Sequence, residues 1–235
     1  MDPLTLLAAE PGRAALLLDV DGVLAPIVLR PEDAVVPPAT RHELERLSGR
    51  YGLVACVTGR TSDDARAIVG VDHLRYVGQH GLELEPAAAE WADRVHEFAR
   101  EWPWPWRELK PLTAAYHYRR AEDETVARAE LEAVATAALA AGLRARWGRL
   151  VLEVLPPVEA TKGTAVRHLL DETGLRRALY AGDDTTDLDG FAALDGLEAA
   201  VRVAVVSAEG PSALGERADL VVGSTEAFLD VLKRL

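Results

Sequence analysis

The sequence has 235 residues, of which 49% are hydrophobic and 27% charged, and its formal net charge is −12. This composition is typical of a folded protein and argues against a disordered chain. The excess of acidic residues disfavours nucleic acid or an anionic membrane surface as a partner, so we expect neither. The N-terminus lacks the features of a secretion signal or a membrane span, and the single cysteine, Cys56, allows no disulfide within the chain. We therefore expect a cytoplasmic protein.

Apolar and helix-like segments alternate in the first third of the chain. Segments 14–20, 52–59 and 74–78 are short and mostly apolar, as strands buried on both faces are. Segments 38–50 and 61–70 lie between them and have the pattern of helices. This alternation predicts a parallel sheet with helices on both faces.

The middle of the chain has a different pattern. It predicts a helix over 90–102, a two-part strand over 107–119, a long Ala-rich helix over 122–141 and a hairpin-like pair over 144–154. We interpret this part as a small α+β unit inserted into the parallel sheet.

The last third returns to the first pattern, with predicted strands at 177–184 and 201–206 and predicted helices at 161–174 and 185–196. We therefore predict an α/β fold in which a parallel-sheet core carries an inserted α+β domain. The expected boundaries are 1–82 for the first half of the core, 83–157 for the insert and 158–235 for the second half of the core.

Two carboxylates, Asp19 and Asp21, stand at the end of the first predicted strand and are followed by Gly22. Charged side chains at the end of a buried strand are costly unless they are paired or bound to a metal. For this pair alone, a turn at Asp21 and Gly22 with Asp19 as a helix cap explains the residues about equally well.

Polar residues also occur at other predicted strand and helix ends. These residues are Thr58, Gly59, Lys162, Asp183, Asp184 and Asp187. Each has a plain structural explanation, as a turn residue, a solvated cation or an acidic helix start. Because ligands in such sheets bind beyond the carboxyl ends of the strands, their coincidence at one edge favours a shared site.

This group of residue types suits the transfer of a phosphoryl group. It contains a carboxylate nucleophile, a second carboxylate able to carry a proton, a hydroxyl group and a lysine. The protein's main task in phosphoryl transfer is to position the group and to neutralise its negative charge. Mg²⁺ prefers carboxylate, carbonyl and water oxygens, so we expect Mg²⁺ as the cofactor.

Four segments resemble, in order, the four motifs of the haloacid dehalogenase superfamily. They are DVDGV (19–23), VTGR (57–60), ATKGTA (160–165) and GDDTTD (182–187). Four motifs in order are far more specific than the first one alone. The resemblance implies a Rossmann-like core with an inserted cap domain and a phosphate-transferring activity, with a phosphomutase open in principle.

The resemblance also implies a role for each matching residue. Asp19 would be the nucleophile that forms an aspartyl-phosphate, and Asp21 would be the general acid and then the general base. We expect other anions near Asp21 to help it keep its proton. Thr58 and Lys162 would hold the phosphoryl oxygens. Mg²⁺ would be bound by Asp19, the main-chain carbonyl of Asp21 and Asp183, with Asp187 and Asp184 in support.

Within this superfamily, further segments are similar to those of trehalose-6-phosphate phosphatases. They are VGQHGLELE (77–85), LKPLTAAYHYR (109–119), LEVLPPVEATKG (152–163) and GDDTTDLDGF (182–191). A disaccharide presents many hydroxyl groups, so its recognition needs hydrogen-bonding side chains. The residues expected to bind the substrate are Gly59, Arg60, His80, Glu83, Lys110, Thr113, His117 and Glu153. A purely structural His117 and a solvated Lys110 stay open as alternatives.

Two departures from the family pattern leave the sugar open. Leu155 stands where the family usually has Arg, and Leu188 stands where it usually has an acid. We expect a small-molecule sugar phosphate, with trehalose 6-phosphate first and with sucrose phosphate, glycosylglycerate phosphate, a hexose phosphate or a pseudo-disaccharide phosphate as alternatives. A non-catalytic sugar-phosphate binding module is the rival from another class. We expect a monomer.

Overall fold

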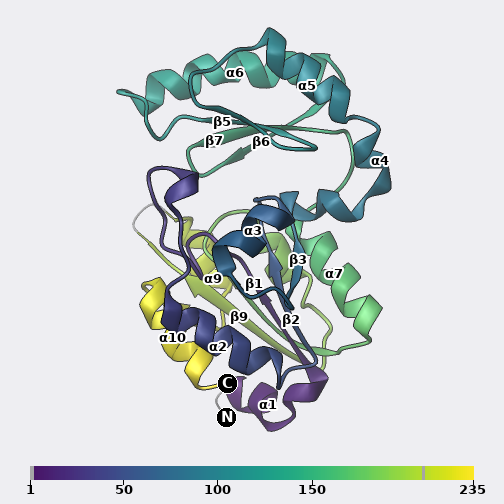
Figure 1. The fold of residues 1–235 in the computed structure, drawn as a ribbon, viewed down its shortest axis with the longest axis vertical. Helices are drawn as coiled ribbons and strands as arrows, with labels where there is room; N and C mark the ends of the chain where they lie inside the picture. Colours follow the sequence, from purple (N-terminus) through teal and green to yellow (C-terminus); the bar gives the residue numbers. More distant parts are fainter. Residues whose placement is uncertain (1–2, 208–209) are drawn as a thin grey trace. The chain divides into compact units, whose positions relative to one another are not determined.

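The computed structural model describes residues 3–207 and 210–235, and the chain divides into two compact units. The first unit comprises Met1–Gly81 and Ala160–Leu235, and the second comprises Leu82–Glu159. Each unit has its own sheet and its own hydrophobic cluster (Figure 1). The two units are therefore described separately.

In the described part of the chain, the sheet of the first unit is parallel throughout and has six strands. They are β1 (Ala14–Leu18), β2 (Leu53–Val57), β3 (Arg75–Val77), β8 (Arg177–Gly182), β9 (Ala199–Val205) and β10 (Leu220–Val222). The strand order is β10-β9-β8-β1-β2-β3. This confirms the predicted parallel sheet and adds β10, which the sequence analysis did not place. Because β1 lies between β8 and β2, the carboxyl ends of these three strands are neighbours.

Helices cover both faces of this sheet. The helical segments of this unit are α1 (Pro3–Ala9), η1 (Pro11–Arg13), η2 (Pro31–Asp33), α2 (Pro38–Ser48), α3 (Ser62–Val69), α7 (Lys162–Thr173), α8 (Asp187–Ala192), α9 (Ser212–Arg217) and α10 (Thr225–Lys233). A further 3-10 segment, η3 (Gln79–Leu84), crosses into the second unit. Figure 1 shows α2 and α10 on one side of the sheet and α7 on the other.

Alternate residues of the buried strands pack on opposite faces of the sheet. Leu16 and Leu18 of β1 belong to the cluster that α2, α3 and α10 form with the sheet, whereas Leu17 between them does not. On the opposite face, Tyr180 of β8 lies against Gly190 of α8. Side chains of consecutive strand residues point to opposite faces, so a continuous apolar run such as 14–18 is what a sheet covered on both sides requires.

The second unit is an antiparallel sheet covered on one face by helices. Its elements are α4 (Pro86–Ala89), α5 (Ala92–Glu101), β4 (Arg107–Leu109), β5 (Ala114–His117), α6 (Glu124–Ala140), β6 (Arg144–Gly148) and β7 (Val151–Leu155), and the strand order is β4-β5-β7-β6. Tyr116, Leu152 and Val154 of the sheet join the apolar side chains of α5 and α6 in one cluster. Residues between them, such as Glu153, belong to the other face.

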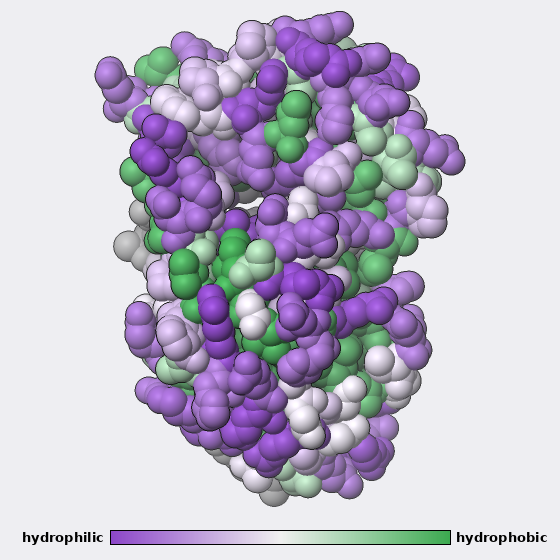
Figure 2. Space-filling model, viewed as in Figure 1, coloured by the Kyte–Doolittle hydropathy of each residue, from purple (hydrophilic) through white to green (hydrophobic). Residues whose placement is uncertain are grey.

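Hydrophilic residues predominate on the face shown in Figure 2, and the apolar side chains there are scattered among them. In the part of the chain that the structure describes, no helix combines the length and the apolar character needed to span a bilayer.

Candidate active site

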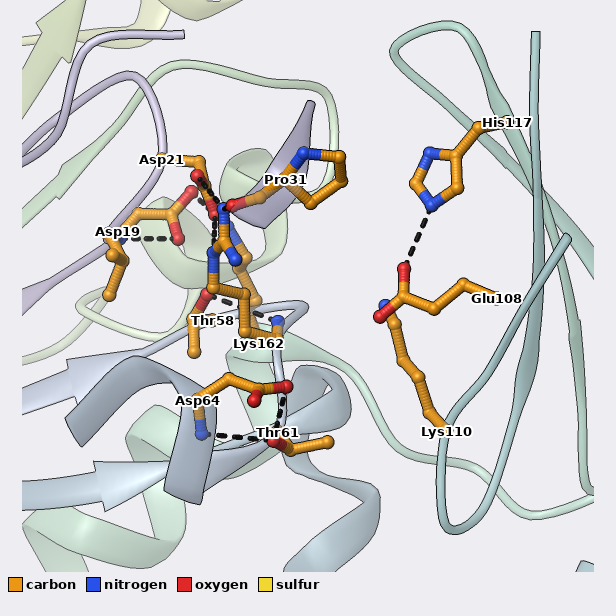
Figure 3. A network of polar contacts seen from close by, with 12 residues as sticks. Asp19, Asp21, Pro31, Thr58, Thr61, Asp64, Glu108, Lys110, His117 and Lys162 are labelled. Carbon is orange, nitrogen blue, oxygen red and sulfur yellow. Dashed lines mark hydrogen bonds and ion pairs between the residues drawn. The ribbon is translucent and has the colours of Figure 1, made fainter. Parts of the chain in front are cut away.

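A buried lysine joins two buried carboxylates at the carboxyl end of the first unit's sheet. Figure 3 shows the lysine, Lys162, and one of the two carboxylates, Asp19. Lys162 Nζ donates to Oδ2 of Asp19 at 2.6 Å and to Oδ1 of Asp187 at 2.6 Å. Burial alone would lower the pKa of Lys162, but the charges of Asp187 and Asp19 raise it above its usual range. The lysine is therefore a fixed positive charge beside Asp19.

The local sequence explains why Lys162 points inward. Thr161 is the N-cap of α7 and forms a capping box with Thr164, so α7 begins at Lys162. A cation in the first turn is unfavourable with respect to the helix dipole, and Lys162 gains instead from its two carboxylate partners. A Cβ at Gly163 would lie 2.5 Å from the carbonyl oxygen of Asp189, so glycine allows α7 to approach α8 closely.

Asp187 fixes the loop between β8 and α8. Its Oδ2 accepts hydrogen bonds from the backbone N–H groups of Asp183 and Asp184 at 3.0 and 2.9 Å. Its Oδ1 accepts from Tyr180 Oη at 2.6 Å as well as from Lys162. Burial, and then the charge of Asp187, raises the pKa of Tyr180 well above its usual range. The hydroxyl group therefore stays protonated and acts as the hydrogen-bond donor to Asp187. These bonds fill the acceptor capacity of the Asp187 carboxylate.

Asp19, Asp183 and Asp187 form a group that fits a divalent cation. One carboxylate oxygen from each residue lies within 4.8 Å of the others, and all three side chains are buried. Burial raises the pKa of Asp19 well above its usual range; Lys162 lowers it, while Asp187 and Asp183 raise it further. With a single buried lysine against three carboxylates, a bound cation would offset the excess negative charge. Because Asp187 is saturated with hydrogen bonds, Asp19 and Asp183 are the two side chains able to ligate the ion.

Gly22 makes room for Asp183 beside the first motif. A Cβ on Gly22 would lie 2.1 Å from Oδ2 of Asp183, and the φ angle of Gly22 is +77°. Only glycine adopts this backbone conformation at low cost and also leaves this space. The close approach places the Asp183 carboxylate next to the main chain that follows Asp21.

Asp21 is held by Arg60. Arg60 Nε donates to Oδ2 of Asp21 and Nη2 donates to Oδ1, each at 2.7 Å, and Nη2 also donates to the carbonyl of Pro31 at 3.0 Å. The sequence analysis expected anions around Asp21, and the structure adds a cation, Arg60, which it did not expect to pair with Asp21. Such a pair orients both carboxylate oxygens.

The loop after β3 supports the loop after β2. His80 N–H donates to the carbonyl of Thr58 at 2.9 Å, and Gln79 N–H donates to the carbonyl of Arg60 at 2.7 Å. Gln79 and His80 have φ angles of 49° and 55°, which residues other than glycine rarely adopt. The His80 ring lies against Gly59, where a Cβ would be 2.5 Å from its Nε2. Gly59 therefore keeps the backbone next to Thr58 accessible to His80.

The predicted residues of the second unit also form a polar group, shown in part in Figure 3. Lys110 Nζ donates to Glu153 Oε1 at 3.1 Å, and His117 Nε2 lies 2.9 Å from Glu108 Oε2. Thr113 is 1% exposed, and its Oγ1 has no hydrogen-bond partner among the described residues. Glu83 lies at the start of this unit, in η3.

The structure thus places the predicted site residues in two groups, one per unit. The group in the first unit contains Asp19, Asp21, Thr58, Gly59, Arg60, His80, Lys162, Asp183, Asp184 and Asp187. The sequence analysis missed Tyr180, which orients Asp187, and Arg146, which pairs with Glu153 at 2.8 Å. A tyrosine inside a buried apolar strand was a usable signal, because its hydroxyl requires a partner.

A parallel sheet with an acidic loop after β1 and another after β8, together with an inserted antiparallel unit, defines the haloacid dehalogenase type of α/β fold. The profile of the trehalose-phosphatase family matches residues 17–219. The chain belongs to the trehalose-phosphatase family.

Curated relatives and solved structures agree with this membership. A trehalose-phosphate phosphatase of Mycobacterium marinum is 33% identical over 208 residues, which is 77% of this chain and 52% of the relative. An uncharacterized glycosyl hydrolase of Mycobacterium tuberculosis is 35% identical over 209 residues, covering 77% of this chain and 15% of that protein. The crystal structure of a trehalose-6-phosphate phosphatase related protein is 25% identical, with a TM-score of 0.73, and the match covers 93% of this chain and 95% of that one. The chain thus spans about half or less of the length of these two curated relatives.

Proposed function

We propose that the chain is a Mg²⁺-dependent phosphatase that hydrolyses a sugar phosphate, with trehalose 6-phosphate as its substrate. The observation that carries this proposal is the buried network in which Lys162 bridges Asp19 and Asp187 beside Asp183. Family membership and the name of the Mycobacterium marinum relative support the choice of substrate.

In the proposed first step, a carboxylate oxygen of Asp19 attacks phosphorus, and the bond between phosphorus and the sugar oxygen breaks. Asp19 is oriented for this, because its Oδ1 accepts from the backbone N–H of Val20 at 2.7 Å and its Oδ2 accepts from Lys162. Asp21 gives a proton to the departing sugar oxygen. Since Asp21 is paired at both oxygens with Arg60, this proton transfer requires the pair to open first.

In the second step, Asp21 accepts a proton from water, the water oxygen attacks phosphorus, and the bond to Asp19 breaks to release phosphate. The buried Thr58 hydroxyl and the ammonium group of Lys162 are proposed to contact the phosphoryl oxygens. A bound Mg²⁺, held by Asp19, Asp183 and the main-chain carbonyl of Asp21, would neutralise charge on the phosphoryl group.

The second unit is proposed to act as the cap that recognises the sugar. Its polar sheet face carries Lys110, His117 and Glu153, which offer both donors and acceptors for hydroxyl groups. A site built to bond sugar hydroxyls rejects a ligand that leaves these groups unpaired.

A panel of phosphate esters tests the function. We expect kcat/KM for trehalose 6-phosphate to exceed that for sucrose phosphate, glycosylglycerate phosphates and hexose phosphates by at least about tenfold, or about 1.4 kcal/mol of transition-state preference. Because Leu155 and Leu188 depart from the family pattern, another disaccharide-like phosphate is the second candidate, and a higher value for one of them would select it. Binding without phosphate release would favour a non-catalytic module instead.

A further inference from the structure

One face of the second unit's sheet carries a row of charged side chains. In the register of the sheet, Glu153 of β7 stands directly opposite Arg146 of β6 and Ala115 of β5, and Ala115 stands opposite Glu108 of β4. Directly opposed residues of antiparallel strands share a face, so the three charged side chains lie on the same face. Helices α5 and α6 pack on the other face, against Tyr116 and its neighbours.

Each carboxylate oxygen of Glu153 has its own cation. Arg146 Nη2 donates to Oε2 at 2.8 Å, and Lys110 Nζ donates to Oε1 at 3.1 Å. The Glu153 side chain is 8% exposed and that of Lys110 is 10% exposed. The carboxylate is therefore fixed between two positive charges rather than free to rotate in solvent.

Arg146 has hydrogen-bond donors that its contact with Glu153 does not use. Its side chain is 23% exposed, and among the described residues its guanidinium group donates only to Glu153. A guanidinium group has five donors in a planar fork, so donors next to the Glu153 carboxylate stay available. A carboxylate and a guanidinium group side by side can bind two neighbouring hydroxyl groups. One hydroxyl donates to the carboxylate, and the other accepts from the guanidinium group.

We propose that Arg146 is a specificity-determining residue of this phosphatase, which fixes Glu153 and presents its remaining donors to the hydroxyl groups of the substrate's sugar. This inference rests on the proposed function and names a residue that the motifs do not contain. It makes Arg146 part of sugar recognition and gives it no part in the chemistry at phosphorus.

Arg144 provides a matched control. It lies two residues earlier on the same strand, opposite Leu155, and its Nη1 donates to the carbonyl of Val158 at 2.6 Å. It is thus an arginine on the same strand face, and its guanidinium group donates to a backbone carbonyl and not to Glu153. Arg144→Met and Arg146→Met remove the same side chain from two neighbouring positions.

The experiment compares two substrates. One is trehalose 6-phosphate, and the other is p-nitrophenyl phosphate, which has no sugar hydroxyl groups. In Arg146→Met we expect KM for trehalose 6-phosphate to rise about tenfold or more, as for the loss of a charged hydrogen bond, while kcat/KM for p-nitrophenyl phosphate stays within about twofold of wild type. Arg144→Met should leave both values unchanged. Arg146→Lys keeps the positive charge but lacks the planar guanidinium group, and it should give a smaller rise in KM for the sugar phosphate.

The possible results separate this inference from the proposed function. Parallel losses on both substrates would mean that Arg146 is only structural, and an unchanged KM for trehalose 6-phosphate would also overturn the inference, in each case leaving the phosphatase proposal intact. If wild type releases no phosphate from any sugar phosphate, both proposals are wrong. Should Arg146→Met fail to fold, Arg146→Lys decides by the same comparison.

Discussion

Lys162 Nζ lies 2.6 Å from Oδ2 of Asp19, and the two side chains are only 2% and 7% exposed. Removing one member of a buried ion pair leaves the other charge uncompensated, which typically costs about 3–5 kcal/mol. We therefore predict that Lys162→Met lowers the free energy of unfolding by about this amount, as measured by denaturant titration. The reason is that Asp19 and Asp187 lose their shared cation.

Lys233→Met is the control for this prediction. Lys233 pairs with Asp230 at the surface, where the two side chains are 51% and 73% exposed, so its loss should change stability by less than about 0.5 kcal/mol. Equal effects of the two substitutions would show that the Lys162 network does not stabilise the fold.

Metal removal tests whether Asp19, Asp183 and Asp187 form a cation site. We predict that EDTA abolishes phosphate release and that Mg²⁺ restores it. A cation bound only by the folded protein stabilises it, by about 2.7 kcal/mol at 100 times its Kd. Mg²⁺ should therefore raise the thermal midpoint of wild type and of Asp189→Asn, whose side chain is exposed, but not that of Asp183→Asn. An equal rise in all three proteins would place the ion elsewhere.

Gly22→Ala should remove activity through the position of Asp183. Alanine at a positive φ costs about 1–2 kcal/mol, and its Cβ would also displace the Asp183 carboxylate. Gly142 has a similar φ of +76° with nothing within 4 Å of the added Cβ, so Gly142→Ala isolates the backbone cost. We expect both variants to lose unfolding free energy, with the larger loss in Gly22→Ala because its Cβ also displaces the Asp183 carboxylate, and we expect loss of phosphate release in Gly22→Ala alone. Normal turnover by Gly22→Ala would contradict the assignment of Asp183.

Asp21→Asn should separate the two proposed steps. A nitrophenolate leaves without a proton, so the first step proceeds without Asp21, whereas the second step loses its general base, which typically contributes 10²–10⁴-fold. We predict a rapid release of about one nitrophenolate per protein molecule from p-nitrophenyl phosphate, followed by slow turnover. Stopped-flow absorbance measures this burst, and Asp33→Asn, in η2, should behave like wild type. Steady turnover without a burst would remove Asp21 from the second step.

The sequence predicted which residues of the candidate site lie at one edge of the sheet better than it predicted their contacts. Asp19, Thr58 and Asp183 follow the neighbouring strands β1, β2 and β8, so strand order alone brings them to one edge of the sheet. The partner of Asp21 was not predictable in this way, because Arg60 reaches it through side-chain conformations that no spacing rule encodes. The same holds for the bond between Tyr180 and Asp187.

The pairing of Arg146 with Glu153 depends on the register of a hairpin. That register follows from the turn between β6 and β7, in which Leu150 has a φ of 56°. Because the turn lacks the Asn-Gly or Asp-Gly pair that usually signals such a hairpin, the sequence predicted a strand pair without fixing which residues face each other. Strand β10, which has three residues, was not predicted.

The central claim is that Asp19 forms a covalent bond to phosphorus during turnover of a sugar phosphate. Rapid acid quench of Asp21→Asn with p-nitrophenyl phosphate, whose leaving group needs no proton from Asp21, followed by borohydride reduction and peptide mass spectrometry, measures this covalent bond directly, because reduction converts a phosphorylated aspartate to homoserine. We predict the mass change at residue 19 alone, and no phosphate release by a folded Asp19→Asn variant. An unmodified residue 19 together with substantial turnover by Asp19→Asn would contradict the mechanism.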